Sequence, residues 1–160
     1  MKKFAKLAGL VIALYVLQTS LLPLIAYHAI SPDLMLLLTL SFAFLRGTKQ
    51  GAVMGFCTGL LQDLATGTFL GMNAFSHLLI GLGCGSASEG VFKEQFFLPV
   101  MASIVVTVGN YFILAILMVL LGYRFNLVAG VESILLPMLI YQLAFAYPVH
   151  RLTYWVDKSS

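Results

Sequence analysis

Six apolar stretches, separated by short polar or glycine-containing turns, divide the 160-residue chain. They cover residues 4–25, 32–45, 51–64, 73–87, 97–121 and 133–155. An apolar helix of about 20 residues crosses the hydrocarbon core of a bilayer. The second to fourth stretches are shorter, and a helix of about 14 residues rises only ~21 Å. We therefore expect either that their ends extend into the loops or that their neighbours partly shelter them. The pattern predicts an all-α fold: one integral membrane domain over residues 1–160, built as a compact bundle of six transmembrane helices.

Composition and charge agree with this interpretation. Hydrophobic residues make up 61% of the chain and charged residues only 9%, whereas a soluble domain has about 25% charged residues. The few cations are dispersed, which argues against a nucleic-acid partner; the lipid bilayer is the expected environment. With the N-terminus in the cytoplasm, eight of the nine cations fall on the cytoplasmic side and Arg124 falls outside, as the positive-inside rule requires. The eight are Lys2, Lys3, Lys6, Arg46, Lys49, Lys93, Arg151 and Lys158. We therefore predict that both termini are cytoplasmic.

Small residues recur at every fourth position in three stretches. Gly51, Gly55 and Gly59 do so in the third stretch, and Gly81 and Gly85 continue the face of His77 in the fourth. Such a stripe lets a second helix approach closely, so we expect the third and fourth helices to pack against each other. Ala5, Gly9 and Ala13 form a similar stripe in the first stretch.

Three polar residues fall at similar depth near the predicted outer face: Asp33, Asp63 and Asn73. Asp63 is open to two interpretations, a functional carboxylate or a residue that orders the start of the fourth helix. Its expected donors are backbone amides around Gly71 and the side chain of Asn73, and on the structural interpretation Asn should replace it. Asp33 follows a potential cap, Ser31, and is expected to stabilise the positive end of the second helix.

No pattern in the chain indicates catalysis. His77 and Asp63 lack a third ligand, so they do not predict a metal site, and there is no nucleophile–base pair, phosphate loop or zinc-ligand spacing. We predict no catalytic, cofactor or metal residues. Asn110 and Gln142 are expected to hydrogen-bond between helices, and His150 to lie at the cytoplasmic interface.

An ordered set of these residues resembles the rod shape-determining membrane protein family MreD. It consists of Pro32-Asp33-Leu34, Gly51, Gly55-Phe56, Gly59-Leu60, Gln62-Asp63, Gly67, Leu70-Gly71 and Asn73-Ala74. The resemblance implies a non-enzymatic scaffold of the bacterial cell-elongation (Rod) complex in the cytoplasmic (inner) membrane. It implies association with MreC and, through it, with RodA, its class B penicillin-binding transpeptidase and MreB filaments. The matched residues carry over only as structural or partner-interface positions.

A second interpretation belongs to another class: the substrate-binding S component of an energy-coupling-factor vitamin transporter. These proteins are also similar in size, span number and glycine content. Their coupling subunit would meet the stripe of Ala5, Gly9 and Ala13, while Asp63, Asn73 and His77 would line a vitamin pocket. The short outer loops, poor in aromatic and polar residues, argue against a high-affinity site.

Overall fold

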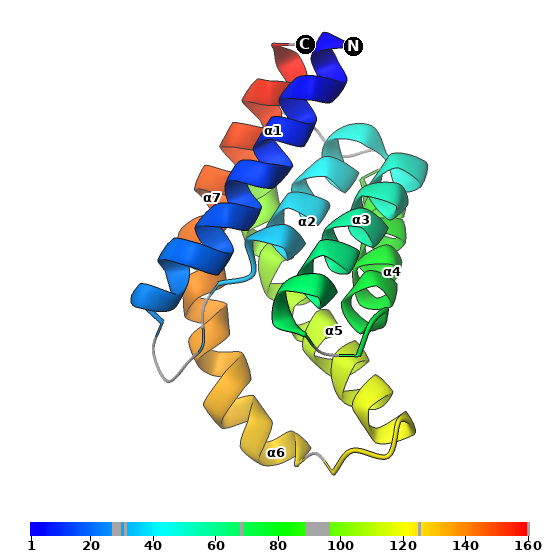
Figure 1. The fold of residues 1–160 in the computed structure, drawn as a ribbon, viewed down its shortest axis with the longest axis vertical. Coiled ribbons are helices and arrows are strands. Elements are labelled where there is room, and N and C mark those ends of the chain that lie inside the picture. The colour runs from blue at the N-terminus through cyan, green and yellow to red at the C-terminus, as the bar shows by residue number, and fades with distance from the viewer. Residues whose placement is uncertain (27–29, 31, 68, 89–96, 125, 160) are drawn as a thin grey trace.

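The computed structural model describes residues 1–26, 30, 32–67, 69–88, 97–124 and 126–159, and within them the chain is an assembly of helices (Figure 1). The α-helices are α1 (Lys2–Val16), α2 (Leu34–Arg46), α3 (Thr48–Thr66), α4 (Met72–Ala87), α5 (Phe97–Leu120), α6 (Leu127–Gly130) and α7 (Leu136–Lys158). A π-helical turn, η1 (Leu17–Leu21), and a 3₁₀ turn, η2 (Leu22–Leu24), extend α1, and a second π-helical turn, η3 (Val131–Leu135), joins α6 to α7.

Each of the six predicted stretches is helical. Three helical segments are long and apolar enough to cross a membrane: Lys2–Leu24, Val100–Leu120 and Leu127–Lys158. The last begins six residues before the predicted residue 133, because α6 and η3 precede α7 without a break. α2 is apolar but shorter, and α3 and α4 lie beside it.

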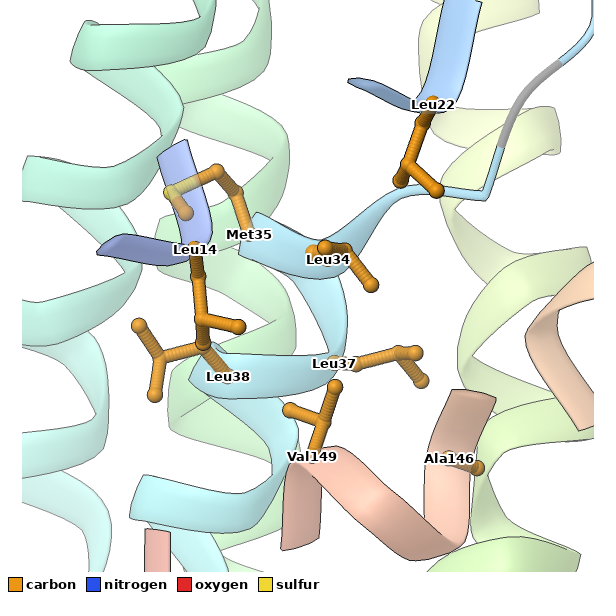
Figure 2. Close-up of a cluster of buried hydrophobic side chains, with 8 residues drawn as sticks. All are labelled: Leu14, Leu22, Leu34, Met35, Leu37, Leu38, Ala146 and Val149. Carbon is orange, nitrogen blue, oxygen red and sulfur yellow. The ribbon is translucent and has the colours of Figure 1, made fainter. Parts of the chain in front are cut away.

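The short helix α2 is the centre of the molecule. All of its residues from Leu34 to Leu45 are buried, because α1, α3, α4, α5 and α7 all contact it. One apolar cluster joins α2 to α1 and α7 (Figure 2). Its buried members are Leu14, Leu22, Leu34, Met35, Leu37, Leu38, Ala146 and Val149. The expectation that neighbours shelter a short helix is confirmed for α2.

The start of α2 differs from the sequence-based expectation. Asp33 is itself the N-cap residue, and its Oδ1 accepts a hydrogen bond from the backbone N–H of Leu36 at 2.9 Å. This bond satisfies one of the amides that a helix start leaves without a partner. Ser31, the cap expected from the sequence, lies outside the described residues. The other end of α2 closes at Gly47.

Both chain termini lie at the same end of the bundle (Figure 1). Two contacts hold that end together: Arg46 pairs with Asp157, and Lys6 Nζ donates to the backbone oxygen of Ser159 at 2.9 Å. α6 and the C-terminal end of α5 lie at the opposite end, near Arg124. Lys6 and Arg46 thus lie at the end that contains the termini, and Arg124 lies at the other; the orientation of the two ends in a membrane stays a prediction, and Lys93 lies outside the described residues.

Candidate functional site

Glycines bring α3 and α4 into backbone contact, as the sequence predicts. Gly51, Gly55 and Gly59 of α3 face Gly81 and Gly85 of α4, and all five are buried. We call these five residues the glycine seam. They are close enough that each needs the absence of a side chain, which is the requirement for close helix approach.

The space at individual seam positions is too small even for alanine. A Cβ on Gly55 would overlap the backbone oxygen of His77, and one on Gly59 would overlap that of Asn73. At Gly51, a Cβ would lie 2.6 Å from the Cβ of Ala43 in α2. These obstacles are mainly backbone atoms, which cannot rotate away. The seam therefore fixes the distance between the two helices.

Asp63, at the end of α3 away from the termini, locks the start of α4. Its Oδ2 accepts from the backbone N–H groups of Gly71 at 2.9 Å and Ala74 at 3.2 Å. Its Oδ1 accepts from the backbone N–H and the side-chain amide of Asn73, both at 3.0 Å. A helix start carries N–H groups without intrahelical partners and positive dipole charge. The Asp63 carboxylate of α3 accepts hydrogen bonds from these N–H groups of α4 and balances that charge. We call this arrangement the Asp63 cap.

The turn into the cap depends on glycine at two positions. Gly67 ends α3 with φ +65°, and Gly71 precedes α4 with φ +107°. Both angles lie in the left-handed region, which glycine adopts without steric cost. The chain can therefore reverse direction after Asp63 and return its next helix start to the same carboxylate.

A second buried carboxylate, Asp33, joins three more elements. Its Oδ2 accepts from the side-chain amide of Gln62 at 2.9 Å. Gln62 in turn accepts from Gln18 Nε2 at 3.4 Å, and Gln18 Oε1 accepts from the backbone N–H of Met35 at 3.0 Å. These contacts join three elements to one another: the start of α2, the end of α3 and the π-helical turn η1 that extends α1.

His77 connects Asp33 to two buried hydroxyls. Its Nε2 lies 3.7 Å from Asp33 Oδ2, and its Nδ1 lies 3.3 Å from Thr58 Oγ1. The hydroxyls of Thr58 and Thr39 are 2.7 Å apart. The Nε2 atom faces Asp33 but has no hydrogen-bond partner among the described residues, because 3.7 Å exceeds hydrogen-bond distance. We call Gln18, Asp33, Thr39, Thr58, Gln62 and His77 the polar core.

The polar core contains the residue types of a nucleophile–base–acid relay, and these side chains lie inside the bundle. Thr58 and His77 are completely buried and Asp33 is 3% exposed, so a substrate has no route to the hydroxyl. Within the described part of the chain, no group of three His, Cys, Asp or Glu residues lies close enough to hold a metal ion. Hydrogen bonding between helices is the chemistry that this geometry supports.

Most of the polar residues picked out by sequence lie where they can order helices. The expected donors to Asp63 are confirmed, with the amide of Ala74 added. Asp63 and His77, considered together as a possible pair, belong to different groups: His77 faces Asp33. Asn110 accepts from Ser76, so its predicted hydrogen bond between helices is confirmed, and the structure shows that it joins α5 to α4.

Three other expectations change. Gln142 is buried, and its side-chain amide has no hydrogen-bond partner among the described residues, so its predicted contact between helices is not seen. His150 is 1% exposed, so the interfacial assignment is wrong: α7 turns this side chain toward the bundle. Gly9 faces outward, with nothing within 4 Å of the position its Cβ would take.

Sequence reasoning missed Gln18, Thr39 and Thr58 as members of the polar core. Thr58 had a signal, because it lies between Gly55 and Asp63 on the face that carries the glycine stripe. Thr39 and Gln18 had none, because a single hydroxyl or amide in an apolar helix shows no partner until the helices are placed in space.

The comparisons with known proteins agree with this architecture. The sequence profile of one family, described as rod shape-determining protein MreD, matches residues 2–156. No curated protein and no solved structure matches the chain. The match extends over α1 to α7 and so includes both the glycine seam and the polar core. The chain belongs to the family of rod shape-determining MreD proteins.

Proposed function

We propose that this chain is a non-enzymatic, multi-pass scaffold of the cell-elongation machinery in the bacterial cytoplasmic membrane. Its family determines rod shape. The proposal adds that it works by presenting a fixed helical surface to partner proteins. Those partners are MreC and, directly or through MreC, RodA and its class B penicillin-binding transpeptidase, with MreB filaments engaged indirectly.

The observation that supports this proposal most strongly is that the buried carboxylates hold helices in place by accepting hydrogen bonds. The Asp63 cap places four donors on one carboxylate, and Asp33 orders α2 and holds Gln62. A buried carboxylate is costly unless it is fully hydrogen-bonded, and both gain their partners from helix starts and neighbouring helices. Neither carboxylate is free of hydrogen-bond partners, and the bonds that they accept fix the positions of the helices.

The sites proposed for this scaffold are structural. The glycine seam sets the spacing of α3 and α4; it consists of Gly51, Gly55, Gly59, Gly81 and Gly85. The Asp63 cap sets the start of α4 through Asp63, Gly71 and Asn73. Asp33 and His77 position α2 against α3 and α4. Partner surfaces are then expected on helices that keep apolar side chains outward, such as α1 and α7.

The vitamin-transporter interpretation has less support. Its pocket would use Asp63, Asn73 and His77, yet these side chains are 1%, 8% and 0% exposed. The carboxylate and the Asn73 amide bond to each other. The grooves on the surface are lined by other residues.

Two measurements test the proposal. The first is recovery of MreC with the tagged chain from membranes, with the folded Gly9→Leu and Gly83→Leu variants marking outward positions on α1 and α4. Loss of MreC from one folded variant alone would map a partner surface, and no recovery with the unaltered chain would contradict the scaffold. The second fuses a reporter active only in the periplasm to the C-terminus: an inactive fusion is expected, with a fusion after Arg124 as the active control.

A further inference from the structure

A lateral groove separates α1 from α3 on the half of the bundle that contains the chain termini. It has a volume of about 510 Å³. Its walls are side chains of α1 and α3, and α2 contributes one residue between them. The lining residues are Phe4, Leu7, Ala8, Val11 and Ile12 of α1, Phe42 of α2, and Lys49, Gln50, Val53, Met54 and Cys57 of α3. A smaller hollow of about 220 Å³ shares Phe4, Leu7, Phe42 and Gln50 with it and adds Lys3 and Arg46 at the same end. We call the two together the α1–α3 groove.

A hydrogen bond bounds the groove at the end away from the chain termini. Away from the termini, the Gln18–Gln62 hydrogen bond joins the α1 extension to α3. Toward the termini, Phe4 and Leu7 of α1 and Phe42 of α2 line both the groove and the smaller hollow. The result is an apolar slot between α1 and α3 with Lys3, Arg46 and Lys49 among its lining residues.

The positive charges that line the groove are not all balanced by negative ones. Arg46 pairs with Asp157, which leaves that pair neutral. Lys3 and Lys49 make no hydrogen bond or ion pair within the described residues, and both line the groove. Asp157 also lines the smaller hollow but pairs with Arg46, so Lys3 and Lys49 have no counter-ion among the described residues.

We propose that the α1–α3 groove binds one anionic phospholipid, with an acyl chain against Val11, Val53 and Met54 and the phosphate between Lys3 and Lys49. An unfilled apolar slot forfeits dispersion contacts along its walls, and an acyl chain supplies them. Basic pockets between membrane helices at the cytoplasmic face are suited to anionic headgroups. The charge pattern selects such a lipid over an apolar partner helix, because an apolar helix would leave both lysines without a counter-ion. The inference does not rest on the proposed scaffold role.

Native mass spectrometry of the purified full-length chain tests this inference directly. The probes are phosphatidylglycerol and phosphatidylcholine with identical acyl chains, supplied in equal amounts. We expect one retained phosphatidylglycerol in preference to phosphatidylcholine. Each lysine near an anionic group contributes about fivefold, so Lys3→Gln/Lys49→Gln should lower the preference roughly 25-fold. The control Lys2→Gln/Arg124→Gln removes the same charge outside the groove and should keep it.

A second pair of variants tests the apolar slot. Ala8→Phe fills the groove from α1 and should abolish retention of either lipid, whereas Ala13→Phe, on the outward face of the same helix, should not. If Ala8→Phe does not fold, Val53→Trp blocks the slot from α3. Glycerol 3-phosphate, which has the headgroup charge without chains, should not displace the lipid.

Three results would overturn the inference. One is equal retention of the two lipids by the unaltered chain. Another is equal loss in the two double variants, which would make the preference a matter of net charge. The third is unchanged lipid retention in folded Ala8→Phe together with lost recovery of a partner protein, which would assign the groove to a helix.

Discussion

Two helices of this protein carry the same small-residue spacing and use it in opposite ways. Gly51, Gly55 and Gly59 of α3 are buried against α4, whereas Ala5, Gly9 and Ala13 of α1 are exposed. α3 also carries Thr58, Gln62 and Asp63, which bond to neighbouring helices near the seam; α1 has no polar residue on its stripe. A small-residue stripe permits close approach, and polar anchors beside it determine whether the approach occurs within the chain.

The largest effect is expected where a side chain is added to the seam. Gly55→Ala or Gly59→Ala places a Cβ on the backbone of α4. Overpacking a core costs about 1–3 kcal/mol, and rigid backbone puts these variants at or above the upper end. Gly83→Ala is the matched control, because its Cβ meets nothing within 4 Å and alanine favours a helix by about 1 kcal/mol. Thermal unfolding in detergent should separate them; equal melting temperatures for all three would place α3 apart from α4.

An effect of similar size is expected at the Asp63 cap. The sequence alone predicts that Asn replaces Asp63, but the four accepted hydrogen bonds change that expectation. An Asn amide would turn its NH₂ group toward two N–H donors, either those of Gly71 and Ala74 or those of Asn73. Hydrogen bonds to a charged group contribute about 1.5–3 kcal/mol each, so Asp63→Asn should destabilise by several kcal/mol and Asp63→Leu by more.

Unfolding followed by circular dichroism measures this loss. Exposed Thr66, one turn after Gln62, supplies the control as Thr66→Ala, which should change stability by less than about 0.5 kcal/mol. An Asp63→Asn variant as stable as the unaltered chain would contradict the cap.

The polar core should give an intermediate effect. Thr58→Val keeps the shape of the side chain but leaves Nδ1 of His77 without a partner, at a cost of about 1–3 kcal/mol. The double variant Thr58→Val/His77→Leu removes both partners and should cost less than the sum of the single changes. Strict additivity in this double-mutant cycle would mean that the 3.3 Å contact contributes nothing.

The smallest effect is expected on α1. Gly9→Leu adds an apolar side chain to a face that meets no other part of the described chain, so stability in detergent should stay within about 0.5 kcal/mol of the unaltered chain. A loss as large as that of Gly59→Ala would remove the contrast between the two stripes.

Contacts across a short turn and the packing of α3 on α4 could be predicted from the sequence, whereas the partners within the polar core could not. Asp63 and its donors Gly71 and Asn73 are separated by a short turn, so the carboxylate can only meet the next helix start. Asp33 and His77 lie 44 positions apart, and their contact depends on three helices being placed together. The α1 stripe shows the same limit: its spacing resembles that of the seam, and only the packed bundle distinguishes them.

The central claim is that Asp63 acts through the shape it gives the protein and not through chemistry of its carboxylate. The most direct test uses a rod-shaped bacterium that depends on this chain. Asp63→Asn is expressed at increasing levels until its folded amount in the membrane, and the MreC recovered with it, equal those of the unaltered chain. The account predicts that rod shape and cell width are then restored. Rounded cells at matched folded amount and matched MreC recovery would contradict it.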